Sequence, residues 1–304
     1  MAIYSIRDLE KLCGIKAHTI RIWEQRYGIV IPKRTKTNIR YYQDADLKTL
    51  LNVALLNKNG FKISKIAKMS PVEMVEKVAA ISEINFEYNT QLDALTISMI
   101  EMDEYKFDRI ISTNIQQIGF ERTVLEIIYP FLDKLSVLWL TGSVNPIQEN
   151  FMSYLIRQKI IAAIDNEPFS SGKNVKKFMI FLPEGENQEL SLLLMHYLLK
   201  SRRNQVVYLG QNVSIQDLKD ACNIHKPDFI FTMVTETYSK QPVQKYVNRL
   251  SENFPDTEII LSGYQIMAQN VSSRGNVSAL GSLDEVIHFL DILRNRSSLR
   301  NIIH

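Results

Sequence analysis

The hydrophobic positions of the first seventy residues predict four short helices, with glycine breaks between them and with Ile63, Ile66 and Met69 in the last. A first helix is expected over residues 5–14, between a capping-box serine and a glycine. The second covers about residues 17–27, where Ile20 and Trp23 share one apolar face. A third apolar pattern continues over about residues 44–60. This part of the chain is therefore predicted to be a compact set of short helices.

Polar and basic side chains occupy the positions that this apolar pattern leaves open. On the second predicted helix they are His18, Thr19, Arg21 and Gln25. Residues 32–42 predict a hairpin, because extended residues flank a polar turn, and its cations are Lys33, Arg34, Lys36 and Arg40. Helix, turn, helix and basic hairpin together predict a winged helix-turn-helix whose second helix enters a DNA major groove.

The remainder of the chain changes its periodicity twice. Residues 71–87 predict a linker helix, and residues 88–167 are helical throughout, with breaks near Asp103, near Gly119 and over 142–146. Helical segments of this length joined by short breaks are typical of an antiparallel four-helix bundle.

From residue 168 onward, short β-rich segments alternate with helical ones. The predicted strands are 178–182, 206–209, 229–234 and 258–261. Buried strands that alternate with helices favour an open parallel Rossmann-like sheet covered on both faces. The predicted fold class is therefore multi-domain α/β, with segments 1–70, 71–87, 88–167 and 168–304.

Charge is distributed unevenly between these segments. Residues 1–70 carry 14 Lys and Arg against 5 Asp and Glu, a net charge of +9, so the rest of the chain carries −6 within the total of +3. A basic module on a mildly acidic body favours a polyanionic partner for the N-terminal segment only. The two cysteines, Cys13 and Cys222, fall in predicted helices far apart in the chain, which excludes a cysteine-rich metal site.

The N-terminal motifs resemble a known family. The segment 19–28, TIRIWEQRYG, followed by Arg40-Tyr41-Tyr42 and Asp46-Leu47, resembles the DNA-binding domain of MerR-type transcription regulators, over about residues 3–70. The resemblance implies DNA contacts from Thr19, Arg21, Arg26, Arg34, Arg40 and Tyr41. Lys16 stands where the family usually has a serine or a similar helix cap, and a lysine there can still contact phosphate. His18 joins this set from the polar helix face.

Three neighbouring residues are expected to have structural roles instead. Trp23 is a large aromatic at an apolar helical position, so it is expected in the core. Glu24 is expected to pair with a nearby arginine, and Tyr42 to pack the hairpin.

The body, a bundle followed by a sheet, resembles the cobalamin-binding region of the light- and vitamin B12-responsive members of the same group, over roughly residues 88–290. In the bundle that family has a tryptophan, nine residues and then Glu-His, and this chain has Trp139 and then Glu149-Asn150. After the first strand, the family pattern acidic-x-His-x-x-Gly is replaced by Glu186-Asn187-Gln188-Glu189-Leu190-Ser191. Two later motifs also differ: Ser-x-Leu is Thr232-Met233-Val234, and a paired glycine is Ser262-Gly263.

These replacements change the chemistry that the resemblance implies. An imidazole nitrogen is a good cobalt donor, whereas the amide of Gln188 is a poor one. We therefore expect no cofactor, with cobalamin held in a non-histidine mode as the alternative. Trp139 and Glu149 either remain as bundle packing or line a pocket between bundle and sheet for another ligand, and both interpretations stay open. The loop that contains Glu184, Glu186 and Glu189 would repel a phosphate.

The sequence thus favours a DNA-binding transcription regulator whose body acts in oligomerisation or in binding an effector or partner. The alternative is a cobalamin-dependent, light-responsive sensor. A single winged module buries too little surface for tight specific binding, so the expected partners are operator DNA and further copies of the chain, in a dimer or tetramer. A regulatory protein and an unidentified small molecule are further candidates.

The sequence contains no residues that indicate another functional class. No nucleophile–base pair is recognisable, so we expect neither catalytic residues nor an enzyme, and no metal site. Neither a signal peptide nor an apolar segment of membrane-spanning length is present, so we expect a cytoplasmic protein with no membrane partner.

Overall fold

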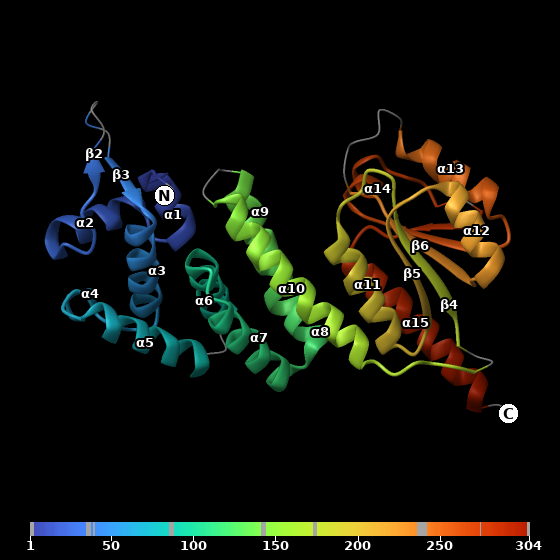
Figure 1. The fold of residues 1–304 in the computed structure, drawn as a ribbon, viewed down its shortest axis with the longest axis horizontal. Coiled ribbons are helices and arrows are strands. Elements are labelled where there is room, and N and C mark those ends of the chain that lie inside the picture. Colours follow the sequence, from blue (N-terminus) through green and yellow to red (C-terminus); the bar gives the residue numbers. More distant parts are fainter. Residues whose placement is uncertain are drawn as a thin grey trace. The chain divides into compact units, whose positions relative to one another are not determined.

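The chain divides into two compact units, Met1–Ile156 and Arg157–His304, in a computed structural model. The structure describes residues 3–34, 38, 40–84, 88–140, 144–172, 175–235, 242–273 and 275–302. Figure 1 shows the elements of both units in chain order. The finer division into four segments stays a prediction.

The N-terminal residues form the winged helix-turn-helix that the sequence predicts. Its elements are β1 (Ile3–Tyr4), α1 (Ile6–Cys13), α2 (Ala17–Tyr27), β2 (Lys33–Arg34) and β3 (Arg40–Gln43). The three strands pair antiparallel in the order β1-β3-β2, so β2 and β3 make the wing. Leu9, Leu12 and Ile20 are fully buried, which confirms the predicted apolar faces of the two helices.

Helices make up the rest of the first unit and continue to residue 166. They are α3 (Asp44–Lys58), α4 (Ile63–Ile66), α5 (Pro71–Ile84), α6 (Tyr88–Glu101), α7 (Glu104–Ile118), α8 (Phe120–Thr123), η1 (Val124–Ile128), α9 (Tyr129–Leu140) and α10 (Pro146–Asn166). The predicted breaks at Asp103 and Gly119 are confirmed, because Asp103 caps α7 and Gly119 follows it with φ +82°. The π-helical turn η1 between α8 and α9 was not predicted.

A five-stranded parallel sheet forms the centre of the second unit. The strands are β4 (Lys177–Pro183), β5 (Gln205–Val213), β6 (Phe229–Met233), β7 (Glu258–Ser262) and β8 (Val277–Ala279), in the order β5-β4-β6-β7-β8. The four predicted strands are confirmed and lie in one sheet, as the Rossmann-like prediction requires. The prediction missed β8, because a three-residue strand is too short to show a periodicity.

Helices cover both faces of this sheet. They are α11 (Glu189–Ser201), α12 (Ile215–His225), α13 (Val243–Asn253), α14 (Tyr264–Ala268) and α15 (Leu283–Ile302). Figure 1 shows α11 and α15 on one face, with α12 and α13 on the other. From β4 the chain moves to β5 on one side and then crosses to β6 on the other, so the carboxyl ends of β4 and β6 form the topological switch point where such sheets bind ligands.

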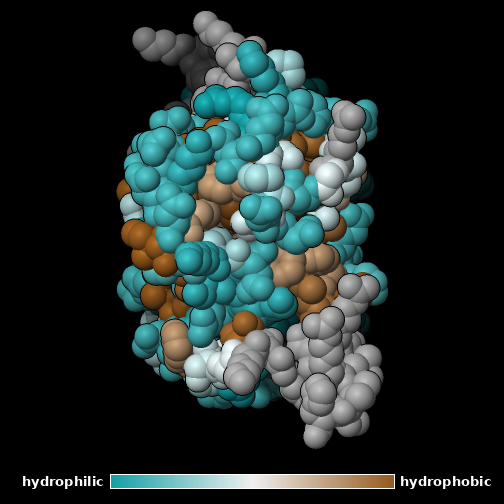
Figure 2. Space-filling model, turned by 90° about the vertical axis from the view of Figure 1, so that its right-hand side faces the viewer, coloured by the Kyte–Doolittle hydropathy of each residue, from teal (hydrophilic) through white to brown (hydrophobic). Residues whose placement is uncertain are grey.

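Apolar side chains hold the second unit together and leave a polar exterior. Met179, Phe181, Ile230, Ile259 and Leu261 are at most 1% exposed and belong to one cluster between the strands and α13. The face of this unit that Figure 2 turns to the viewer is predominantly hydrophilic, with small separate apolar patches. Within the described residues, no helix combines the length and apolar character needed to cross a bilayer.

Candidate functional site

The turn between α1 and α2 fixes where the second helix begins. Gly14 ends α1 in the left-handed region, with φ +65°. Glu10 then accepts the Ala17 backbone N–H at 3.2 Å through Oε2, and its Oε1 lies 3.3 Å from Lys16 Nζ. The Ala17 hydrogen bond and the Lys16 ammonium hold the pKa of Glu10 below its usual value. A carboxylate thus replaces the side-chain cap that Lys16 itself does not supply.

One face of α2 is buried and the other is open. Ile20 is fully buried and Trp23 is 6% exposed, as expected for core residues. His18, Arg21 and Arg26 are exposed, and Thr19 is half-buried with its Oγ1 3.4 Å from His18 Nδ1. The side chains predicted to contact DNA from this helix therefore lie on its accessible side.

The wing carries further cations beside α2. Arg34 is exposed and its Nη1 donates to Asn38 Oδ1 at 2.7 Å, which braces the tip of the hairpin. Arg34 pairs in register with Arg40, and Lys33 with half-buried Tyr41. Lys36 lies outside the described residues.

Glu24 ties the wing to α2. Its Oε1 lies 3.5 Å from Arg40 Nε, and its Oε2 accepts the Tyr42 hydroxyl at 3.2 Å. The Glu24 side chain is only 13% exposed and Tyr42 is fully buried, and this burial raises the pKa of Tyr42 to about 12. The expected pairing of Glu24 with an arginine is thereby confirmed, and so is the packing of Tyr42. Arg40, with a side chain 35% exposed, positions the wing as well as presenting charge.

Two apolar side chains on this surface were not singled out from the sequence. Ile22 is 38% exposed beside Arg21 on α2, and Ile31 is 80% exposed just before the wing. Apolar contacts with thymine methyl groups are one way that proteins distinguish bases in the major groove. The signal for Ile22 was present, because an isoleucine interrupts the polar face of the second predicted helix.

The second unit places the altered ligand motif at the start of α11. Gln188 is exposed and stands at the N-cap of α11, where its side chain makes no capping hydrogen bond. Glu186, the acidic residue of that motif, is 5% exposed, and its Oε1 accepts the Thr235 backbone N–H at 2.9 Å. Glu189 is not part of an acidic loop as expected, because it lies in α11 and pairs with Arg157 at 2.9 Å.

The residues at the ends of β6 and β7 pack against other parts of the chain itself. Thr232 is fully buried, and its hydroxyl has no hydrogen-bond partner among the described residues. The Ser262 carbonyl accepts the Val234 N–H at 2.9 Å. A Cβ on Gly263 would lie 2.5 Å from the Val234 carbonyl oxygen, so the backbone of Val234 fills the space that this glycine provides.

The altered bundle motif is only partly described. Glu149 is half-buried and Asn150 is exposed, both in the first turn and a half of α10. The side chain of Trp139 lies outside the described residues, so its predicted role stays a prediction.

These residues do not fit a histidine-ligated cobalamin. Gln188 offers an exposed amide, Asn150 another, and neither supplies an imidazole nitrogen to cobalt. The backbone of Val234 lies against Gly263, so the packing of the chain itself accounts for a glycine at this position. Over the described ranges, no three His, Cys, Asp or Glu side chains gather closely enough to hold a metal ion.

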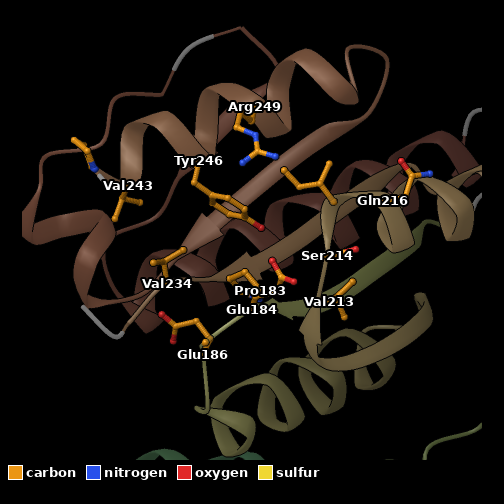
Figure 3. A pocket seen from close by; sticks show the side chains of 13 residues that line it. Pro183, Glu184, Glu186, Val213, Ser214, Gln216, Val234, Val243, Tyr246 and Arg249 are labelled. Carbon is orange, nitrogen blue, oxygen red and sulfur yellow. The ribbon is translucent and has the colours of Figure 1, made fainter. Parts of the chain in front are cut away.

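A pocket of about 410 Å³ nevertheless lies at the switch point, within the second unit. Figure 3 shows Tyr246 of α13 directing its hydroxyl into it, toward the loop after β4. That hydroxyl is buried with no hydrogen-bond partner among the described residues. Burial, with smaller contributions from Glu184 and Glu186, raises the pKa of Tyr246, while Arg249 opposes the shift. The pocket thus combines this neutral donor with charges of both signs.

Comparisons with known proteins give matches to the N-terminal domain and to the body. Residues 4–71 match the model of the MerR HTH family regulatory proteins. The HTH-type transcriptional repressor CarH of Myxococcus xanthus is 25% identical over 258 residues, covering 83% of this chain and 85% of CarH. CarA of the same organism, also named an HTH-type transcriptional repressor, is 25% identical over 228 residues, 74% of each chain. The HTH-type transcriptional regulator MlrA of Escherichia coli K12 is 34% identical over 76 residues, 25% of this chain and 31% of MlrA.

The length of these matches shows where the likeness lies. A match of 258 residues cannot fit within the first 71, so the likeness to CarH extends through both units. The winged helix and the parallel sheet, which the resemblance to this group implied, are both observed. Residues 4–71 therefore carry a MerR-type DNA-binding domain, and the body is similar in sequence to those of CarH and CarA, which supports a role in DNA-binding transcription regulation.

Proposed function

We propose that the chain reads operator DNA with the exposed face of α2 and clamps the flanking phosphates with the β2–β3 wing. The observation that carries this proposal is the common exposure of Lys16, Arg21, Arg26 and Arg34 on the same small basic domain. His18, Thr19 and Arg21 have the types and spacing for base edges, and Arg34, Arg40 and Tyr41 for the sugar–phosphate backbone. Because CarH and CarA are named repressors, repression is the direction to test first.

The regulator acts as a dimer or tetramer in this proposal. One winged domain contacts a few base pairs and buries too little surface for tight specific binding, so two domains on half-sites about one helical turn apart are required. The body supplies the contacts between copies. We further propose that the chain works in the cytoplasm, where its DNA is, and that it is not an enzyme.

The body regulates without a histidine-ligated cobalamin. Exposed Gln188 at the start of α11 and exposed Asn150 in α10 support this part of the proposal, because neither amide can replace an imidazole at cobalt. In its place, the body takes a protein partner or another small molecule, or controls assembly alone.

Selection from a random pool of DNA duplexes with the full-length protein tests this function. We expect an enriched, near-palindromic sequence with half-sites about 10 base pairs apart. Native mass measurement of the complex should give two or four copies. An unenriched pool, or a complex with a single copy of the chain, would contradict the proposal.

A second candidate is a cobalamin sensor that binds with the cofactor's own base on cobalt. The buried Thr232 hydroxyl, which lacks a partner among the described residues, favours it, since such a group gains from a bound polar ligand. Mixing the protein with adenosylcobalamin separates the two functions, because only the sensor retains the corrinoid spectrum after desalting.

A further inference from the structure

Helix α3 belongs to the DNA-binding domain and to the helical bundle at once. Leu47, Leu51, Val53 and Leu56 are at most 2% exposed, and at 100° per residue they lie on different sides of the helix. Apolar residues on opposite sides of one helix require packing partners on both sides. Helix α3 packs against α1 of the winged domain, against α5, and against α6 of the bundle. Any shift of α5 or α6 therefore acts on α3, the helix against which α1 packs.

Two ion pairs fasten α3 to α6. Lys48 Nζ lies 2.8 Å from Glu101 Oε1, and Lys58 Nζ lies 2.6 Å from Asp93 Oδ2. The two carboxylates are only 7% and 11% exposed. Partly buried pairs are costly to break, because separation leaves a desolvated charge without its partner. The two helices consequently move together.

An apolar pocket of about 220 Å³ opens beside α3, within the first unit. Its walls are Val75 and Val78 from α5, Ala94 and Ile97 from α6, and Ile110 from α7. A cavity of about 150 Å³ with apolar walls is already large enough for benzene. The pocket therefore accommodates one or two fused rings.

Asn52 contributes a polar group to this pocket from α3. It extends from α3, lines the pocket and is 4% exposed. Its amide lies at the pocket wall, where it can donate and accept hydrogen bonds with a molecule that enters the pocket.

The charges around the mouth of the pocket compensate one another. Lys106 pairs with Glu101 and lies 3.5 Å from Asp103, and Arg109 stacks over the Tyr105 ring at 5.5 Å. The mouth thus offers no strong attraction to an ion. An uncharged ligand fits these surroundings best.

From these observations we infer that the pocket is an effector site for a neutral molecule of one or two fused rings that hydrogen-bonds to Asn52. The bound ring separates or braces α5 against the joined pair of α3 and α6, and α3 transmits the change to the winged domain. The regulatory half of this inference rests on the proposed DNA-binding function. The binding half does not depend on it.

Titration calorimetry on the full-length protein with indole, phenol and benzamide as probes tests the binding half. Saturable binding to one site is expected for at least one probe. Asn52→Leu keeps the side-chain size and removes the amide, so its affinity for that probe should fall by about tenfold or more. Ala94→Phe fills the pocket and should abolish binding. Tyr246→Phe removes a hydroxyl from the pocket of the second unit and should leave binding unchanged.

Folding does not obscure this test. Asn52→Leu replaces the amide with an apolar side chain of similar size in a largely apolar wall, so its thermal unfolding midpoint should stay close to that of the wild type, and it decides the matter even if Ala94→Phe fails to fold. Absence of saturable binding for all three probes, or equal binding by Asn52→Leu, would overturn the site.

Gel shifts with the selected operator test the regulatory half. The bound probe should change the DNA affinity of the wild type by about fivefold or more and that of Asn52→Leu far less. Unchanged DNA affinity with probe binding intact would overturn the coupling through α3. If the wild-type protein does not bind the operator even in the absence of a probe, the proposed function is contradicted. The calorimetric result on probe binding is not affected by that outcome.

Discussion

The exposed face of α2 and the carboxyl edge of the five-stranded sheet differ in whether the expected functional side chains are present. On α2, apolar Ile20 and Trp23 build the fold, and the cations beside them keep the chemistry that DNA requires. At the sheet edge the buried strands are equally well formed, yet the ligand position holds Gln188. Buried apolar positions specify a fold, whereas a few polar side chains specify its function. The two can therefore be retained or lost separately.

Gly263→Ala tests this comparison with the largest expected effect. Gly263 has φ +110° and ψ 160°, a region that is essentially restricted to glycine, and an added Cβ would meet the Val234 carbonyl oxygen. We expect a loss of about 3 kcal/mol or more in the free energy of unfolding of the second unit. Chemical denaturation followed by circular dichroism measures it.

Gly119→Ala is the matched control for that variant. Gly119 has a similar backbone conformation, with φ +82° and ψ 163°, but nothing lies within 4 Å of its added Cβ. It should cost clearly less than Gly263→Ala. Equal costs would mean that the contact with Val234 is not what requires a glycine at position 263.

Arg21→Ala tests the DNA side of the comparison. Removal of an exposed arginine that contacts a base or a pair of phosphates should weaken operator binding by about 2 kcal/mol, which is about thirtyfold. Gel shifts at fixed salt measure the change. Arg122→Ala removes the same charge from α8, where Arg122 pairs with Glu126, and should have little effect. Equal affinities for Arg21→Ala and wild type would remove Arg21 from the reading face.

Glu24→Gln separates positioning from contact. The substitution weakens the pairing with Arg40 and keeps the side-chain shape, so the wing loses part of its anchor on α2. The Glu24 side chain is only 13% exposed, so its effect on DNA would be indirect. We nevertheless expect operator affinity to fall by about fivefold, or about 1 kcal/mol. Tyr42→Phe, which removes only the hydroxyl donated to Glu24, should have a smaller effect. A larger effect from Tyr42→Phe would show that the ion pair is not the anchor.

The smallest effect is expected at His196. It tests whether this histidine of the body only packs against its neighbours or also makes stability depend on pH. It stacks on Tyr208 with ring centroids 5.3 Å apart, and burial, with Lys200 nearby, lowers its pKa to about 4 from 6.5. Between these values the unfolded chain binds the extra proton, so stability is full above pH 6.5 and declines as the pH falls toward 4. The decline should be about 1 kcal/mol, because part of the ring is exposed.

The matched variant for this prediction is His196→Phe. It retains the stacked ring and cannot titrate, so its unfolding free energy should change less between pH 6.5 and 4 than that of the wild type. Denaturation curves across this range measure the difference. Parallel pH profiles for the two proteins would contradict a titrating His196.

Local patterns predicted what depends on neighbouring residues. The second helix was predicted over 17–27 and observed as Ala17–Tyr27, because its apolar spacing and terminal glycine are local signals. The pairing of Arg40 with Glu24 was expected only in part, since the sequence indicated an arginine partner without saying which one. The three-residue strand β8 and the turn η1 carry no periodicity that could identify them.

Long-range packing accounts for what the sequence did not yield. The apolar residues Val53 and Leu56, opposite the leucine face of residues 44–58, were a signal that α3 is shared with the bundle, but they do not identify the partner helices. The pocket beside Asn52 depends on α5, α6 and α7 together. No spacing within one segment predicts such an arrangement, because the lining residues come from four different helices.

The absorbance spectrum of the full-length protein, mixed with adenosylcobalamin and then desalted, tests the central claim most directly. The exposed Gln188 at the start of α11 predicts a protein fraction with no corrinoid absorbance. A retained, stoichiometric corrinoid spectrum would contradict the claim that the body has kept its fold and lost this ligand.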